Sequence, residues 1–144
     1  MSPDSALLSS AAHPPTLAEY IGLQAAFEHF NKTLEAFGGL LDNPMIVLAR
    51  RARAGGHFHE DRFVAREGGE TCHELGLNPD HFFGRNDKEI LSVLVHEMCH
   101  ADQTRRGVAP RKNYHNRDFA ATMKRVGLHP SNTGRLAVGR SARA

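Results

Sequence analysis

The 144-residue sequence has only two cysteines, Cys72 and Cys99, and no apolar run near the ~20 residues needed to cross a bilayer. Two cysteines exclude a four-cysteine zinc site, although they could form one disulfide. We expect two reduced thiols in a cytoplasmic protein. Residues 1–15 have neither a basic region nor a long apolar stretch, so we expect no secretory signal and no membrane partner.

Acidic residues are scarce in the C-terminal third. From Gln103 to Ala144 there is one acid, Asp118, against ten lysines and arginines. The net charge is only +2, because residues 1–102 contain the other fifteen acids and eight basic residues. So basic a region is compatible with a polyanionic partner such as nucleic acid, bound without sequence specificity because no base-reading motif is present. The alternative is a solvated surface with a loose basic tail.

The most informative pattern present is His96-Glu97-Met98-Cys99-His100. Histidines at positions i and i+4 lie about 40° apart around a helix, so both imidazoles can bind one cation. Glu97 lies between them and can take a proton from metal-bound water, which is the arrangement of zinc metalloproteases. A catalytic zinc site needs a third protein ligand. His115 is the candidate, with His129 in reserve.

This motif lies in a predicted helix from Asp87 to Thr104. Asn86 and Glu89 have the spacing of a capping box at its start. Cys99 points about 100° away from the second histidine of the motif, so it is expected to pack rather than bind metal. Apolar residues surround most of the helix, which we therefore expect to be central and buried: Ile90, Leu91, Val93, Leu94 and Val95. Histidines and a glutamate are costly to bury there unless they bind something.

Other polar residues have less specific interpretations. His57 and His59 would face one side of a strand and could bind a metal, but exposed strand histidines are the preferred reading. Gln103 shares a helix face with the second histidine of the motif and could support it, whereas Asp102 lies about 200° round the helix. Tyr114 could stabilise an oxyanion or simply pack.

The pattern of the whole chain predicts an α+β fold. A first helix starts at a Thr16–Glu19 capping box and ends at Gly38-Gly39, and its apolar stripe has helical spacing: Tyr20, Leu23, Phe27, Phe30, Leu34 and Phe37. Three short strands follow between turns, at residues 45–49, 57–66 and 73–77. The last helix is predicted at residues 116–126. We expect an N-terminal helix, a small antiparallel sheet, a central zinc-binding helix and a C-terminal helix.

The motif and its surroundings resemble the SprT-like, or Spartan-type, zinc metalloproteases. In that family a His-Glu-x-x-His helix is followed by a His-x-x-[Glu/Asp]-Phe segment, which residues 114–119 match; residues 73–79 and 127–134 also resemble family segments. The resemblance implies a zincin-like minimal metalloprotease with one Zn2+ and DNA-associated or DNA-crosslinked protein substrates. Its implied ligands are His96, His100 and His115, with Glu97 as the base. The chain lacks the C-terminal zinc ribbon that many relatives carry.

These observations predict three segments and one favoured function. The segments are a flexible arm at residues 1–15, a SprT-like metalloprotease domain at 16–134 and a basic disordered tail at 135–144. The favoured function is a zinc-dependent endopeptidase. One alternative is a zinc-dependent hydrolase of a non-protein amide. The other is a non-catalytic DNA-binding protein with a structural zinc, against which Glu97 argues because a structural site needs no base.

Overall fold

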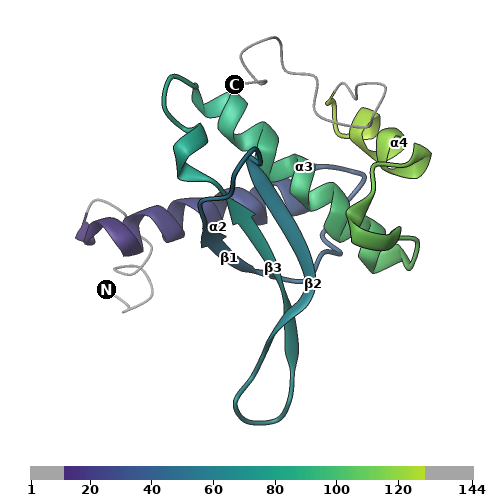
Figure 1. Ribbon diagram of the computed structural model, residues 1–144, viewed down its shortest axis with the longest axis horizontal. Helices are drawn as coiled ribbons and strands as arrows, with labels where there is room; N and C mark the ends of the chain where they lie inside the picture. Colours follow the sequence, from purple (N-terminus) through teal and green to yellow (C-terminus); the bar gives the residue numbers. More distant parts are fainter. Residues whose placement is uncertain (1–11, 129–144) are drawn as a thin grey trace.

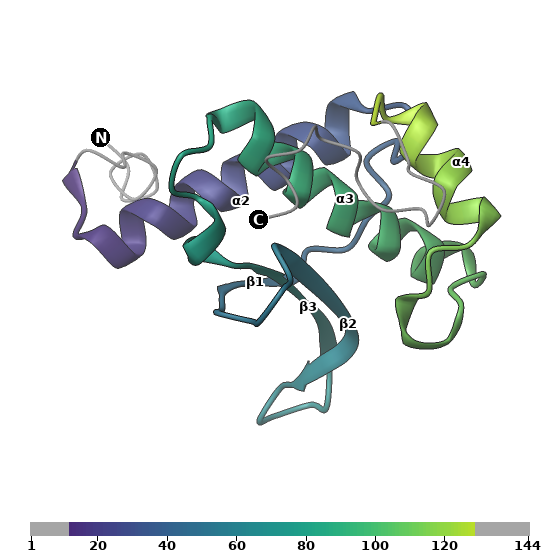
Figure 2. The same ribbon diagram turned by 45° about the horizontal axis from the view of Figure 1, so that its top comes forward.

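The computed structural model describes residues 12–128. Its regular elements are α2 (Pro15–Thr33), β1 (Met45–Leu48), β2 (Gly56–Val64), β3 (Thr71–Leu77), α3 (Asp87–Arg106) and α4 (Arg117–Arg125), with short 3-10 turns η2 (Pro79–His81) and η3 (Arg111–Asn113). The helices lie on one side of the sheet, and the β2–β3 hairpin extends beyond them (Figures 1 and 2). Most of the predicted arm, and the whole predicted tail, fall outside the described residues. None of the helices within 12–128 could cross a membrane.

The predicted α+β class is confirmed, but the sheet is mixed rather than antiparallel throughout. Its strand order is β1-β3-β2. β2 and β3 are antiparallel, as expected, whereas β1 and β3 run parallel. The reason is the position of β3, which pairs between the two earlier strands instead of beside β2 alone. Since β1 and β2 run in opposite directions, a strand between them must be parallel to one.

Local end signals explain two of the three helices. The capping box of α3 is present: Asn86 Oδ1 accepts from the Glu89 N–H at 2.9 Å, and Glu89 Oε1 accepts from the Asn86 N–H at 3.3 Å. Asn116 caps α4 in the same way, accepting from the Phe119 N–H. The predicted cap at Thr16 is wrong. The helix α2 begins at Pro15 without a side-chain cap, because proline's fixed φ suits the first helical position.

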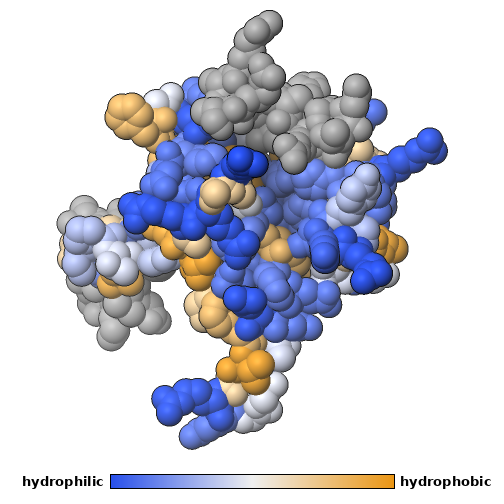
Figure 3. Space-filling model, in the orientation of Figure 1, coloured by the Kyte–Doolittle hydropathy of each residue, from blue (hydrophilic) through white to orange (hydrophobic). Residues whose placement is uncertain are grey.

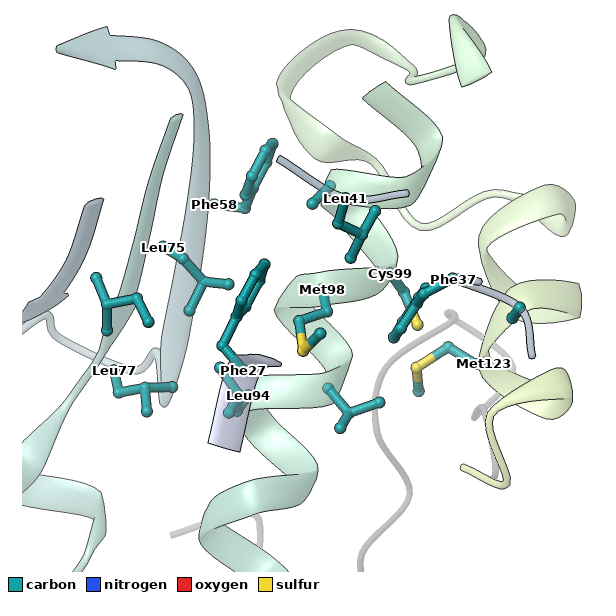
Figure 4. Close-up of a cluster of buried hydrophobic side chains, with 14 of the residues drawn as sticks. Phe27, Phe37, Leu41, Phe58, Leu75, Leu77, Leu94, Met98, Cys99 and Met123 are labelled. Carbon is teal, nitrogen blue, oxygen red and sulfur yellow. The ribbon is translucent and has the colours of Figure 1, made fainter. Parts of the chain in front are cut away.

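The core lies between the sheet, α2 and α3 (Figure 4). Phe27 and Phe37 of the predicted stripe are fully buried, together with Leu94 and Met98 of α3. Cys99 is buried among them, as predicted, and burial raises the pKa of its thiol. Both cysteines are free thiols. The face of the molecule shown in Figure 3, in the orientation of Figure 1, is mainly hydrophilic.

One close contact in the sheet was not foreseen. His57 on β2 pairs with Gly76 on β3, and its ring covers that glycine, where a Cβ would lie 1.9 Å from His57 Cε1. The Nε2 atom of His57 hydrogen-bonds Glu74 Oε2 at 2.5 Å, and the histidine side chain is only 10% exposed. The expectation of an exposed His57 is therefore wrong, although His59 is exposed as expected. Only the strand register, which brings Glu74 and Gly76 beneath the ring, reveals this pairing.

Two glycine-to-alanine variants test this contact with opposite expected signs. Gly76→Ala should lower the free energy of unfolding by about 1–3 kcal/mol, because the added methyl displaces His57 from Glu74. Gly22→Ala, within α2 where a Cβ meets nothing within 4 Å, should raise it by about 0.5–1 kcal/mol. Urea unfolding curves of both variants provide the measurement. An unchanged or raised free energy of unfolding in Gly76→Ala would contradict the close packing at Gly76.

Candidate metal centre

Three histidines converge at one point. His96 and His100 come from α3, and His115 comes from the loop before α4; one ligand atom from each lies within 4.8 Å of the others. The Nε2 atoms of His100 and His115 are 3.1 Å apart. A tetrahedral site with metal–nitrogen bonds of about 2.0–2.1 Å separates its nitrogens by about 3.3 Å. The three residues named from the sequence thus form a group that could hold a metal ion.

The protonation states of these histidines suit a cation. Burial, aided by the charge of His115, lowers the pKa of His96 to about 3. Burial and the other two histidines lower the pKa of His100 to about 2. Both imidazoles are therefore neutral near pH 7 and offer a lone pair. Their Nδ1 atoms are buried without a hydrogen-bond partner within the described part of the chain.

A phenylalanine forms one wall of the histidine cluster. Phe119 of α4 is fully buried and stacks on His100, with centroids 4.2 Å apart, and on His115, with centroids 4.5 Å apart. It meets His96 edge-on at 5.0 Å. These contacts restrict the planes of all three imidazoles. The sequence pattern indicates Phe119 as a core residue of the last helix, and its place at the end of the family segment 114–119 is the signal for a position beside the histidines.

Glu97 lies beside the histidines and faces the same pocket. Its Oε2 is 3.9 Å from His96 Nε2, and its side chain is almost fully buried. Burial raises the pKa of Glu97 to about 8, an effect that the nearby charge of Arg51 opposes. A Cβ at Gly56 would lie 3.1 Å from Glu97 Cγ, so β2 approaches α3 closely at this point. Only a glycine permits that approach.

The pocket has a volume of about 460 Å³ and opens between α3, β2 and the loop that carries His115. Its lining contains one acid, Glu97, and three cationic side chains. Arg51 and Arg53 precede β2, and Lys112 belongs to η3. Its other lining residues are Ala54, Gly55, Gly56, His57, Phe58, Val93, Asn113 and the three histidines. The arrangement can hold a cation and a proton acceptor at the floor of a basic pocket.

A model of the SprT-like family matches residues 23–137. The chain belongs to the SprT-like family. The match includes all three histidines and Glu97, and it confirms the resemblance seen in the motif. Family membership suggests a function related to metalloproteases. No curated protein and no solved structure matches the chain.

In this SprT-like chain, Gln103 supports the loop of the third histidine rather than His100. Its Nε2 donates to Asn116 Oδ1 at 3.0 Å and to Asp118 Oδ2 at 2.9 Å. Since Asn116 also caps α4, the start of that helix is tied to α3 immediately after His115. The predicted support of His100 by Gln103 is therefore wrong, because its hydrogen-bond partners lie at the start of a separate helix, which spacing along α3 does not indicate.

Ion pairs strengthen the link between α3 and α4. Asp102 is fully buried and accepts hydrogen bonds from Arg105 and Arg106, so it does not support His100, as expected. Arg106 also pairs with Asp118 at 2.8 Å. This bond from Arg106 holds the pKa of Asp118 below its ordinary value, against the opposing effect of burial and with help from Gln103. The two arginines are therefore engaged within the protein.

The remaining candidates lie away from the three histidines or outside the structure. Tyr114 is 72% exposed and is not among the residues that line the pocket, so neither an oxyanion role nor a packing role is supported. His59 is exposed on β2. His129, the reserve ligand, lies outside the described residues.

Replacing Arg106 with methionine should break the link between α3 and α4. We expect Arg106→Met to lower the free energy of unfolding by about 1–3 kcal/mol, and Arg105→Met, whose guanidinium bonds Asp102 alone, to lower it by under about 1 kcal/mol. The lowered pKa of Asp118 stabilises the fold above its unfolded value, about 4, and this contribution is lost as pH falls through the folded pKa. Thermal melts between about pH 2 and 7 should therefore show a shallower acid dependence in Arg106→Met than in the wild type. Equal losses in the two variants would contradict the bridging role.

Proposed function

We propose that this SprT-like protein is a zinc-dependent endopeptidase, with zinc held by His96, His100 and His115. The observation that carries the proposal is the buried cluster of three histidines with Glu97 beside it at a pocket. Three imidazoles that converge on one point are a donor set that suits catalytic zinc and leaves a fourth position for water. Family membership supports the same class of function. The two free thiols support a cytoplasmic location.

Glu97 is the residue that moves protons in this mechanism. A bound zinc would lower the pKa of its coordinated water toward about 7, polarise the substrate carbonyl and favour the ionised form of Glu97. Glu97 accepts a proton from the attacking water and returns it to the leaving amine. Its carboxylate, 3.9 Å from His96 Nε2, is near enough to serve a water at the converging nitrogens. Phe119 closes one side of the cluster and keeps bulk water away from it.

The exposed edge of β2 is an argument for a peptide substrate rather than a small non-protein amide. The Asn78 N–H donates to Gly55 O, so in the alternating antiparallel ladder the backbone groups of Gly56 and Phe58 point away from β3. Both residues line the pocket. The Phe58 carbonyl already accepts from Asn113, but an extended peptide could add to this edge through main-chain hydrogen bonds to Gly56 and to the Phe58 N–H, which would bring its carbonyl groups near the histidines. A non-protein amide would not use these bonds, and a structural zinc site would not use Glu97.

Conservative substitution of the base separates chemistry from metal binding. The purified protein should contain about one equivalent of zinc after mild dialysis. Glu97→Gln keeps the side-chain shape and should leave zinc content unchanged while proteolysis falls by roughly 10²–10⁴-fold. His115→Ala should instead reduce zinc retention sharply, because two histidines hold the ion poorly. Zinc analysis and cleavage of an unfolded protein substrate give both readouts, and a metal-free but active wild type would refute the proposal.

We also propose that its substrates are associated with DNA, bound non-specifically through the basic C-terminal third. The three cations that line the pocket support a polyanion beside the site. Arg105 and Arg106 contribute little to this surface, because both are paired with Asp102. Arg111 and Lys112, on the exposed η3 turn beside the pocket, are the described residues best placed to contact phosphates.

Salt dependence tests the DNA proposal. If three to five residues engage duplex phosphates, raising the salt from about 50 to about 200 mM should weaken binding by about 40- to 500-fold, since each contact contributes about −0.9 to the log–log slope. Replacing Arg111 and Lys112 with glutamate should make the slope shallower, whereas Lys32→Glu on α2 should leave it unchanged. Titration of labelled DNA provides the slopes. No binding at about 50 mM salt would favour a DNA-independent hydrolase.

A further inference from the structure

Asn113 joins the loop of the third histidine to the edge of the sheet. Its Nδ2 donates to the carbonyl oxygen of Phe58 at 2.5 Å, across 55 positions in the sequence. That carbonyl lies on the outward-facing edge of β2, where the N–H of a further strand could donate to it. The Asn113 amide donates in that position instead. His115 follows only two residues later. The contact therefore lies close in sequence to the proposed third ligand, although Asn113 itself is not one of the three clustered histidines.

The backbone at this contact is unusual. Lys112 and Asn113 have φ values of 54° and 53°, in the left-handed region that residues with a side chain rarely adopt. Asparagine tolerates this region better than most residues, but lysine does not. Two such residues in succession reverse the chain sharply. The reversal directs the Asn113 amide toward β2 while Tyr114 continues in an extended conformation toward His115.

The segment around His115 is held on both sides. After it, Asn116 caps α4 and accepts a bond from Gln103 of α3. Before it, the two backbone hydrogen bonds of the turn are long. The Asn113 N–H donates to Pro110 O and the Tyr114 N–H to Arg111 O, both at 3.3 Å. Tyr114 is largely exposed and gives no buried anchor. The Asn113 amide is therefore the short, directional contact on that side.

We propose that Asn113 is a positioning residue for the third metal ligand, a role that rests on the proposed metal site. Its amide fixes the loop against the sheet and so helps to hold His115 Nε2 3.1 Å from His100 Nε2. Removing the amide should leave the rest of the fold intact and widen the range of positions open to His115. The loss should then appear in metal affinity rather than in the stability of the metal-free protein.

Asn113→Gly is the main test variant, because glycine keeps the left-handed backbone without strain and removes the amide. Lys112→Gly is the control for added loop freedom: it places the same residue one position earlier, at nearly the same φ, and retains Asn113. Asn31→Ala is the control for loss of an asparagine clip elsewhere, since Asn31 exchanges two 3.1 Å hydrogen bonds with the backbone of Leu41. Each protein is compared with the wild type.

Zinc affinity is measured by competition with a chromophoric chelator. The geometry of the metal site is followed in the visible spectrum of the Co2+-loaded protein, and the stability of the metal-free fold in thermal melts with excess chelator. Asn113→Gly should raise the zinc Kd by about 10- to 100-fold, alter the Co2+ spectrum and change the metal-free melt less than Asn31→Ala does. Lys112→Gly and Asn31→Ala should retain the wild-type zinc Kd.

Two results would overturn the inference. They are an unchanged zinc Kd in Asn113→Gly, or an equal loss of affinity in Lys112→Gly. An unchanged Kd together with a lowered metal-free melt would make Asn113 an ordinary structural clip. A wild type that binds no zinc would instead refute the proposed function, so the two failures are distinguishable.

Discussion

The burial of two imidazoles and a carboxylate on one helix is the constraint on which the rest of this structure depends. His96, Glu97 and His100 lie on α3 with almost no exposure, where polar groups are costly unless they have partners. Burial keeps both imidazoles neutral and raises the pKa of Glu97. The surrounding elements provide what such groups need: a third imidazole, an aromatic wall and a pocket open to an extended strand edge.

Features encoded within a few residues could be predicted from the sequence. The capping box at Asn86 and Glu89 and the i, i+4 histidine pair are local, so spacing alone indicates them. His115 is different, because it lies in a separate segment, and only its resemblance to the family pattern suggested that it would join the pair. The α+β class also followed from the order of helices and strands.

Contacts between distant segments could not be predicted in the same way. The strand order depends on which strands β3 pairs with. The residue pattern of a single short strand does not indicate its partners. The pairing of His57 with Glu74 follows from the β2–β3 register, so spacing alone suggested an exposed histidine. The partners of Gln103 and Asn113 likewise lie on other elements. Gln103 and Asn113 both hold the segment of His115, the proposed ligand whose position local spacing does not indicate.

The two faces of α3 divide stability from chemistry. Leu94 and Met98 face the core with the strands and α2 (Figure 4). His96, Glu97 and His100 line the pocket. The core is closed without any metal, since its apolar contacts join α2, α3, α4 and the sheet directly. Loss of a bound ion would therefore affect the pocket face of the helix and the loop of His115 before it affected the fold. A small zinc-folded domain behaves in the opposite way, because its metal replaces a core. This separation suits the proposed catalytic site. A metal that takes part in the reaction need not also hold the chain together.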